Sequence, residues 1–270
     1  MDTTTEKLSY LIDTRERIRA AIIDKGVEAA GATFRQFAEL IAEISGGGIH
    51  PEPATRGLYI HFDLHNNTGD GYDPSATVWK DLVGDRDGTI VNPVGWSDSG
   101  LRFGGNSVAT RVDFRGDIPE ILEAGGDYVF VVTAMSEGAL TRHGRLFGES
   151  PFPTLNLTPD SNLFWYYRAP IDQTFRPEEA MAINKMTHLA IRYTALTRTI
   201  ELFRNGLYIG GISGVGNAGA VAVAQLGNRP QGDRTLNGRI CNFKGFAGRL
   251  SEIEIYQDFL YAQEQYGIED

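Results

Sequence analysis

The sequence predicts a mainly β protein, an antiparallel jelly-roll β-sandwich preceded by a short module of two helices. Three observations support this fold class. Short runs of alternating apolar and polar residues recur from residue 57 onward, as is typical of strands with one buried face. The 32 glycines and 11 prolines, spread along most of the chain after residue 45, indicate many turns. No strand-like run precedes a long helical pattern, so a parallel sheet is disfavoured.

The first 45 residues are predicted to form two helices. One spans about residues 4–25, with Thr3 and Glu6 as a capping box and Gly26 after its end. The other begins at Thr33. Because small helix pairs bury too little surface to fold alone, we expect other copies or an anchoring protein to cover their apolar residues: Leu8, Leu11, Ile18, Ile22, Phe34, Phe37, Leu40, Ile41 and Ile44. Residues 46–56 are predicted to be a Gly/Pro linker.

Residues 57–270 are predicted to form the sandwich. The run at residues 127–135 is apolar on both faces over five positions, as expected of a central strand covered on both sides. Asn205-Gly206 lies between two apolar runs and is a dipeptide that type I′ hairpin turns require. The predicted strands cover residues 58–64, 100–105, 127–135, 187–194, the hairpin at 199–211, and a closing strand at 248–259.

Composition excludes several classes of function. Lys and Arg number 25 against 35 Asp and Glu, for a formal net charge of -10, and basic residues do not alternate with aromatics, so we expect no nucleic-acid partner. With 41% hydrophobic residues the chain can bury a core, and we expect no membrane insertion. Cys241 is the single cysteine, so no internal disulfide can form. The start, MDTTTEK, lacks signal-peptide features, and we expect synthesis in a cytoplasm.

Two further segments resemble known families. The block W-x-D-L-x-G-x-x-D-G-T at residues 79–89, with the strand, Asn-Gly, strand hairpin, resembles laminin-G-like, concanavalin A-like jelly-roll domains over about residues 57–260. Residues 7–44 resemble a helical module at the start of many phage tail and baseplate proteins. Together they imply a bacteriophage virion protein of tail-fibre, baseplate or receptor-binding type, located in the virion. Its sandwich would bind a host-surface polysaccharide or a neighbouring virion protein, residues 1–45 would contact other virion proteins, and the likeness to phage fibres implies a homotrimer.

Two segments are candidates for carbohydrate binding. NLFWYYRAP, at residues 162–170, places Trp165 and Tyr167 on one side of a strand next to Arg168. Such aromatic rings can stack on sugars while arginine bonds to hydroxyls, unless both faces of the strand are buried. The polar loop LHNNTGDGYDPSAT offers Tyr72 as a further ligand contact, with Asp70 and Asp73 as a candidate Ca²⁺ site, unless it is only an insertion.

Other acidic and histidine residues have two interpretations each. The resemblance implies that Asp81, Asp85 and Asp87 are turn residues, with a shared Ca²⁺ site as the alternative. A second group, His61, Asp63 and His65, shares one strand face, and its spacing suits either Zn²⁺ or a solvated outer face.

A pair of glutamates raises the question of catalysis. Glu252 and Glu254 lie two residues apart and are similar to the acid pair of concanavalin A-like retaining glycanases, but the third acid of that pattern is missing. A solvated strand face is the simpler interpretation. We therefore expect binding without catalysis and no cofactor apart from the candidate Ca²⁺. Two alternatives stay open: a purely structural head-decoration or tail-scaffold protein, and a glycan hydrolase using this glutamate pair.

Overall fold

The structure is a computed structural model that describes residues 12, 15–16, 18–19, 52–105, 108–115, 126–138, 143–148, 154–158, 164–168, 173–175, 181–214, 223–229 and 231–269. For β10, β11 and residues 115, 223 and 224 it describes the backbone alone. The chain divides into two units, Met1–Glu52 and Pro53–Asp270.

In the first unit, the described residues Ile12, Arg15, Glu16, Ile18 and Arg19 have helical backbone within the first predicted helix. Arg19 donates to the Glu16 carboxylate at 2.9 and 2.7 Å. The rest of that helix, the second predicted helix and most of the predicted linker lie outside the described residues.

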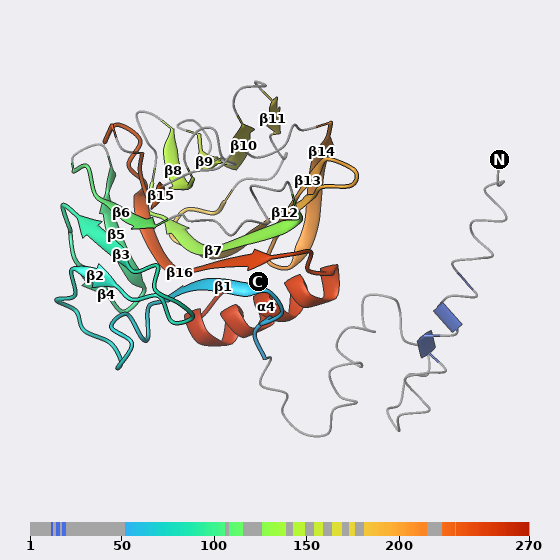
Figure 1. Cartoon of the computed structure of the whole chain (residues 1–270), viewed down its shortest axis with the longest axis horizontal. Coiled ribbons are helices and arrows are strands. Elements are labelled where there is room, and N and C mark those ends of the chain that lie inside the picture. Colours follow the sequence, from blue (N-terminus) through green and yellow to red (C-terminus); the bar gives the residue numbers. More distant parts are fainter. Residues whose placement is uncertain are drawn as a thin grey trace. The chain divides into compact units, whose positions relative to one another are not determined.

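The second unit consists mainly of two antiparallel sheets (Figure 1). Sheet A has the strand order β14 (Leu207–Ser213), β13 (Thr199–Arg204), β12 (Met186–Thr194), β7 (Tyr128–Ser136), β16 (Asn237–Ala247), β5 (Gly100–Gly104) and β4 (Trp96–Ser97), and β1 (Leu58–Asp63) also pairs with β16. Sheet B has the order β11 (Gln173–Phe175), β10 (Phe164–Arg168), β9 (Thr154–Leu157), β8 (Gly144–Phe147), β15 (Val223–Leu226), β6 (Arg111–Arg115), β3 (Gly88–Val91) and β2 (Val78–Trp79).

A shared core joins the two sheets. Strand β7 alternates: one face of it contributes Phe130 and Val132 to a cluster that also contains Leu146 and Leu155 of sheet B. Its other face contributes Val129 to a separate buried cluster. Both faces of β7 are therefore covered, as its sequence predicted. The mainly β, antiparallel character is confirmed, and the shared core makes the unit a β-sandwich.

The predicted closing strand at residues 248–259 is wrong, because these residues begin helix α4 (Glu252–Tyr266). Ser251 caps the helix and forms a capping box with Glu254. Ile253 and Ile255 are two residues apart, as apolar residues on one face of a strand are. On the helix they point in different directions, so Ile253 is 71% exposed and Ile255 is buried. Within the described part of the chain α4 is the one complete helix, and no helix there has the length and apolar content needed to cross a membrane.

Helix α4 lies along the face of sheet A that points away from sheet B (Figure 1). Its buried residues Ile255 and Phe259 pack against two clusters that include Val131 of β7 and Leu64. Since the helix removes this face from water, polar side chains there are buried as well.

One ion pair is fully buried beneath α4. Lys244 of β16 donates to Asp258 of α4 at 2.6 Å, and both side chains are 0% exposed. His188 Nε2 of β12 lies 3.3 Å from the other Asp258 oxygen. Burial raises the pKa of Asp258, but the charge of Lys244 and the contact with His188 outweigh it and hold the pKa well below its usual range.

The hairpin between β13 and β14 is confirmed. Asn205 and Gly206 have φ values of 48° and 74°, the left-handed conformations of both central positions of a type I′ turn. A Cβ on Gly206 would lie 2.6 Å from the Tyr256 ring of α4. The glycine thus serves both the turn and the close approach of the helix.

Candidate functional site

The loop between β1 and β2 is held in shape by its own side chains; we call residues 66–76 the Tyr72 loop. Asn67 is buried, and its amide bonds to both backbone groups of Asp73 at 2.8 Å. The Thr68 hydroxyl donates to the Gly71 carbonyl at 2.8 Å, and the Gly71 amide donates to Asn66 Oδ1 at 2.7 Å. These hydrogen bonds hold the loop backbone on both sides of Tyr72, so the backbone at this residue is preorganised for a ligand.

Tyr72 forms the outer end of a series of aromatic rings that begins in the core. Phe62 and Trp79 are fully buried and stack with centroids 5.5 Å apart. The Trp96 ring follows, edge-on to Trp79 at 4.9 Å, and Tyr72 lies edge-on to Trp96 at 6.5 Å. Trp96 Nε1 also donates to the Ala76 carbonyl of the loop at 2.9 Å. The Tyr72 side chain is 42% exposed, so a core-anchored ring presents part of its surface to solvent.

Two carboxylates, Asp73 and Asp98, act on the phenol of this ring, and Asp70 precedes it by two residues. Asp70 and Asp98 are exposed and Asp73 is half-buried. Ser75 donates its hydroxyl and its amide to Asp73 Oδ1 at 2.7 and 2.8 Å, which lowers the Asp73 pKa. Partial burial and then the charges of Asp98 and Asp73 raise the pKa of Tyr72. The phenol therefore stays protonated at neutral pH and can donate a hydrogen bond.

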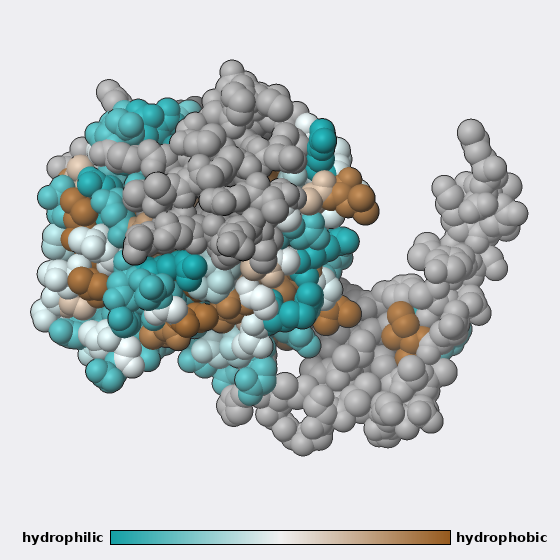
Figure 2. Space-filling view, in the orientation of Figure 1, coloured by the Kyte–Doolittle hydropathy of each residue, from teal (hydrophilic) through white to brown (hydrophobic). Residues whose placement is uncertain are grey.

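An exposed aromatic ring with several acceptors beside it is suited to a polyhydroxylated ligand. The ring can stack on apolar C–H groups, while carboxylates and the phenol bond to hydroxyls. Hydrophobic residues on the face seen in Figure 2 form small separate groups among hydrophilic ones. The coloured residues of that surface do not form the broad apolar patch that is typical of a stable protein interface.

The aspartates of the 79–89 block shape a turn, as the sequence interpretation held. Both oxygens of the buried Asp81 accept backbone amides: Oδ1 from His61 and Val83, Oδ2 from Gly84 and Arg86, at 3.0 to 3.2 Å.

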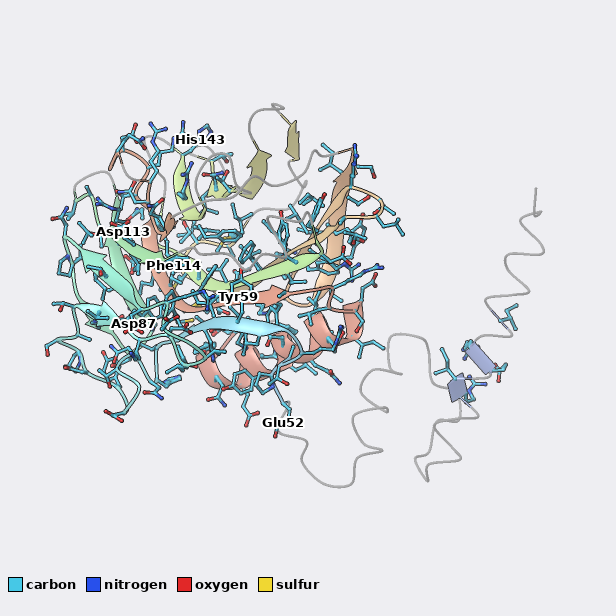
Figure 3. The ribbon with its side chains drawn as sticks, in the orientation of Figure 1. Glu52, Tyr59, Asp87, Asp113, Phe114 and His143 are labelled. Atoms are coloured by element: carbon cyan, nitrogen blue, oxygen red, sulfur yellow. The ribbon has the colours of Figure 1, made fainter. Side chains whose placement is uncertain are left out.

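The other two aspartates of the block lie at its surface. Asp87 accepts from Lys80 at 2.7 Å and from the Asp81 amide at 3.1 Å, and it lies at the end of the unit that carries β2 and β4 (Figure 3). Asp85 is exposed. The Asp81 carboxylate ties this turn to β1.

The described residues of the predicted metal sites do not form a cluster of metal ligands. Among the described residues, no group of three or more His, Cys, Asp or Glu side chains is placed to hold an ion. Asp70 and Asp73 are in the Tyr72 loop, where Asp73 is engaged by Ser75. The Ca²⁺ site there stays a prediction.

The histidine strand face is also organised differently from its prediction. His61 and Asp63 face α4 rather than water: Asp63 accepts from the Tyr266 hydroxyl at 2.8 Å, and His61 Nε2 is 3.7 Å from Asp63. His65 is exposed, and its Nε2 contacts the Gln265 carbonyl at 3.1 Å. The solvated-face interpretation fails for His61 and Asp63, because a helix covers them.

The predicted aromatic segment forms β10, whose side chains lie outside the described residues. In the backbone register Trp165 is opposite Asn156, Tyr167 opposite Thr154, and Arg168 opposite Gln173. Strand β10 is next to one edge of sheet B, whereas β2, where the Tyr72 loop ends, is the opposite edge. The two candidate segments therefore lie near opposite edges of sheet B.

The proposed acid pair does not form. Glu252 and Glu254 are two residues apart on a helix, a spacing that does not place side chains together. Glu254 accepts from Arg56 at 2.9 Å, and this bond, followed by the amide of Ser251, lowers its pKa to about 2. Its partner Glu252 is 67% exposed. The strand that the comparison with glycanases required is absent at these residues.

The sequence analysis did not predict the contributions of Trp96 and Asp98 to this site, nor that Asn67 orders the loop backbone. Asn67, next to Gly69 and Gly71 in a polar loop, carried a recognisable signal for side-chain-to-backbone bonding. Nothing in the sequence indicates that Asp98 lies near Tyr72, because the β4–β5 turn that carries it reaches the loop only through the packing of Trp96.

Solved structures with this fold include carbohydrate-active proteins. A sialidase from Trypanosoma rangeli matches with a TM-score of 0.59 and 17% identity, over 78% of this chain and 33% of that one. The same sialidase in complex with 2,3-difluoro-KDN matches with a TM-score of 0.64 and 17% identity, over 94% of this chain and 39% of that one. The chain thus spans about a third of the length of these sialidases.

A single domain matches over its whole length. Domain 4 of the GH43 extracellular arabinanase AbnA from Geobacillus stearothermophilus, solved in complex with arabinotriose, has a TM-score of 0.55 and 17% identity, over 77% of this chain and 100% of that domain. At this identity the likeness shows the fold. No protein-family model matches the sequence, and no curated protein matches it either.

These matches correct one expectation and leave another as a proposal. The sequence-based expectation that the protein is not an enzyme is wrong as a conclusion from the fold, because sialidases share that fold. The three structures named above are not phage proteins. The matches therefore show a fold shared with these structures, and the virion role stays a proposal.

Proposed function

We propose that the protein is a carbohydrate-binding β-sandwich and that the Tyr72 loop is its glycan-contacting surface. The observation that carries this proposal is the exposed Tyr72 ring, fixed to the core through Trp96 and Trp79 and surrounded by hydrogen-bonding groups. The arabinanase domain that matches over its full length was solved with arabinotriose, which supports an oligosaccharide as the ligand.

The test is replacement of the ring in the full chain. Tyr72→Ala should weaken binding of arabinotriose, or of the best ligand on a glycan array, by about 1–2 kcal/mol. Tyr72→Phe should retain most of the affinity because it retains the ring. The matched control is Tyr208→Ala, which removes another exposed tyrosine, on β14. Melting curves should change little in the Tyr72 variants. Unchanged glycan binding in Tyr72→Ala would refute the assignment.

The β10 segment is a second candidate for the contact surface. Trp165→Ala should then weaken glycan binding by about 1–2 kcal/mol and leave the melting curve nearly intact. Large unfolding with unchanged binding would instead make Trp165 a core residue. Measuring Trp165→Ala and Tyr72→Ala side by side decides which end of sheet B contacts the sugar.

Glycan hydrolysis is a second candidate function, favoured by the sialidase matches. Glu252 and Glu254 do not supply the acid pair, since they lie apart on α4. Release of reducing ends from bacterial surface polysaccharide, or of sialic acid from sialyllactose, tests for activity. The double variant Glu252→Gln with Glu254→Gln should retain any activity found, and its loss in that variant would contradict the structural argument.

The finer proposal is a bacteriophage virion protein with a concanavalin A-like, laminin-G-like jelly roll. Residues 1–45 would join other virion proteins and assemble a homo-oligomer, with a trimer as our choice, and the sandwich would face a host polysaccharide. The resemblance of residues 7–44 and of the sandwich to phage modules supports this virion role. A chain truncated to residues 57–270 should then be monomeric by light scattering while the full chain is not. Equal oligomeric states would place the subunit contacts in the sandwich.

A further inference from the structure

Two carboxylates act on the Tyr72 phenol, those of Asp98 and Asp73. Asp70 and Asp73 belong to the same loop, and Asp98 follows Trp96, whose ring contacts Tyr72. Asp98 is exposed and its charge acts on the Tyr72 phenol, and Asp70, two residues before Tyr72, is exposed as well.

The basic residues that contact these segments are themselves paired with carboxylates. Arg239 donates to the hydroxyls of Ser97 and Ser99, on either side of Asp98, at 2.9 and 2.6 Å, and its Nε is held by Glu137 at 2.6 Å. Lys80 touches the loop, since a Cβ on Gly69 would lie 3.2 Å from Lys80 Cγ. Its ammonium, however, is held by Asp87 at 2.7 Å, and Asp81 and Asp85 also act on it. The three other carboxylates therefore leave the loop region with excess negative charge, within a chain of formal charge -10.

Glycans differ in the charge that they bring to such a surface. A neutral oligosaccharide offers only hydroxyls, which donate to carboxylates at no electrostatic cost. A sialylated glycan adds a carboxylate that two or three like charges would repel. The raised pKa of Tyr72, caused by burial first and by Asp98 and Asp73 second, shows that these charges act at the ring itself.

We infer that the Tyr72 loop selects glycans without acidic groups and rejects sialylated or uronic-acid-bearing ones, with Asp70 and Asp98 as the specificity-determining residues. This inference rests on the proposed glycan-binding function. The expected ligand therefore differs from sialic acid, with which a Trypanosoma rangeli sialidase of the same fold was solved.

The test compares matched glycans on the full chain by calorimetry: lactose with sialyllactose, and arabinotriose with an oligogalacturonide. The neutral member of each pair should bind more tightly in dilute buffer. The difference in affinity should shrink at about 0.5 M salt, because salt screens exposed charges. Equal affinity, or tighter binding of the acidic members, overturns the inference. If no member binds, the proposed function fails and the inference with it.

Substitution then assigns the selectivity. Asp98→Asn keeps a hydrogen-bonding side chain and should raise the affinity for the acidic glycan relative to the neutral one by about 1.5- to 5-fold, the range of an exposed charge interaction. Adding Asp70→Asn should raise the ratio further. Glu252→Gln is the control, because it removes one carboxylate charge from an exposed side chain of α4, 3.5 Å from Arg192. A ratio unchanged in Asp98→Asn, or changed equally by Glu252→Gln, overturns the local assignment while leaving glycan binding intact.

Discussion

The buried pair of Lys244 and Asp258 allows a quantitative prediction about α4. Both side chains are 0% exposed and their charged atoms are 2.6 Å apart. Lys244→Met has nearly the same length but leaves Asp258 buried without its counter-charge. Breaking a buried pair in this way costs about 3–5 kcal/mol.

That cost converts into a measurable change in melting temperature. For a domain of this size each kcal/mol shifts the midpoint by roughly 2–4 °C, so the full chain with Lys244→Met should melt roughly 6–20 °C lower. The double variant Lys244→Met with Asp258→Leu should recover most of the loss, because an apolar pair of similar volume needs no counter-charge. Differential scanning calorimetry and urea unfolding measure both effects.

An exposed ion pair on the same helix provides the control. Arg56 pairs with Glu254 at 2.9 Å, but its side chain is 63% exposed, so Arg56→Met should cost far less stability than Lys244→Met because water screens an exposed pair. If Lys244→Met costs no more than Arg56→Met, Asp258 is not a buried carboxylate and α4 does not seal this face of sheet A.

The pH dependence of the variant has a definite sign. The Asp258 pKa is lowered in the folded protein, so its contribution to stability is present above the unfolded value of about 3.9 and is lost as pH falls below it. The stability difference between the parent and Lys244→Met should therefore narrow in acid. A gap that widens below pH 4 would contradict this linkage.

Two further predictions concern the same helix. Burial, and then the charge of Lys244, lowers the pKa of His61 to about 4. The contribution of His61 to the free energy of unfolding should therefore be lost progressively from about pH 6.5 down to 4, by at most roughly 3 kcal/mol. In His61→Asn the acid-induced loss measured by calorimetry in this window should be smaller, and an unchanged profile would mean that His61 is solvated. Gly206→Ala should destabilise by about 1–3 kcal/mol, because it strains a left-handed turn and drives a Cβ into Tyr256; a urea midpoint equal to that of the parent would mean that α4 does not pack there.

The sequence by itself determined the elements whose signals are local. Alternation marked β1 and β12, continuous apolar residues marked β7, and Asn205-Gly206 marked the hairpin, because each depends on neighbouring residues alone. It also singled out Tyr72 as a surface aromatic in a polar loop.

Only the tertiary structure decided the rest. Over so short a run, the alternation of Ile253 and Ile255 is compatible with a strand and with a helix. The segment is a helix in the structure because this places Phe259 and Ala262 against sheet A. Strand β16, which pairs with β1, β5 and β7, was not predicted, because a bulge between Ile240 and Asn242 shifts its alternation and Lys244 is buried against α4.

The same reason separates the two candidate binding segments and assembles the site. Trp165 and Tyr72 are both candidate aromatic contacts, but strand order places their segments near opposite edges of sheet B. Asp98 joins Tyr72 through the packing of Trp96. Contacts between residues distant in sequence depend on how the strands pair and the sheets pack, and these depend on the free energy of the whole core rather than on any local run of residues.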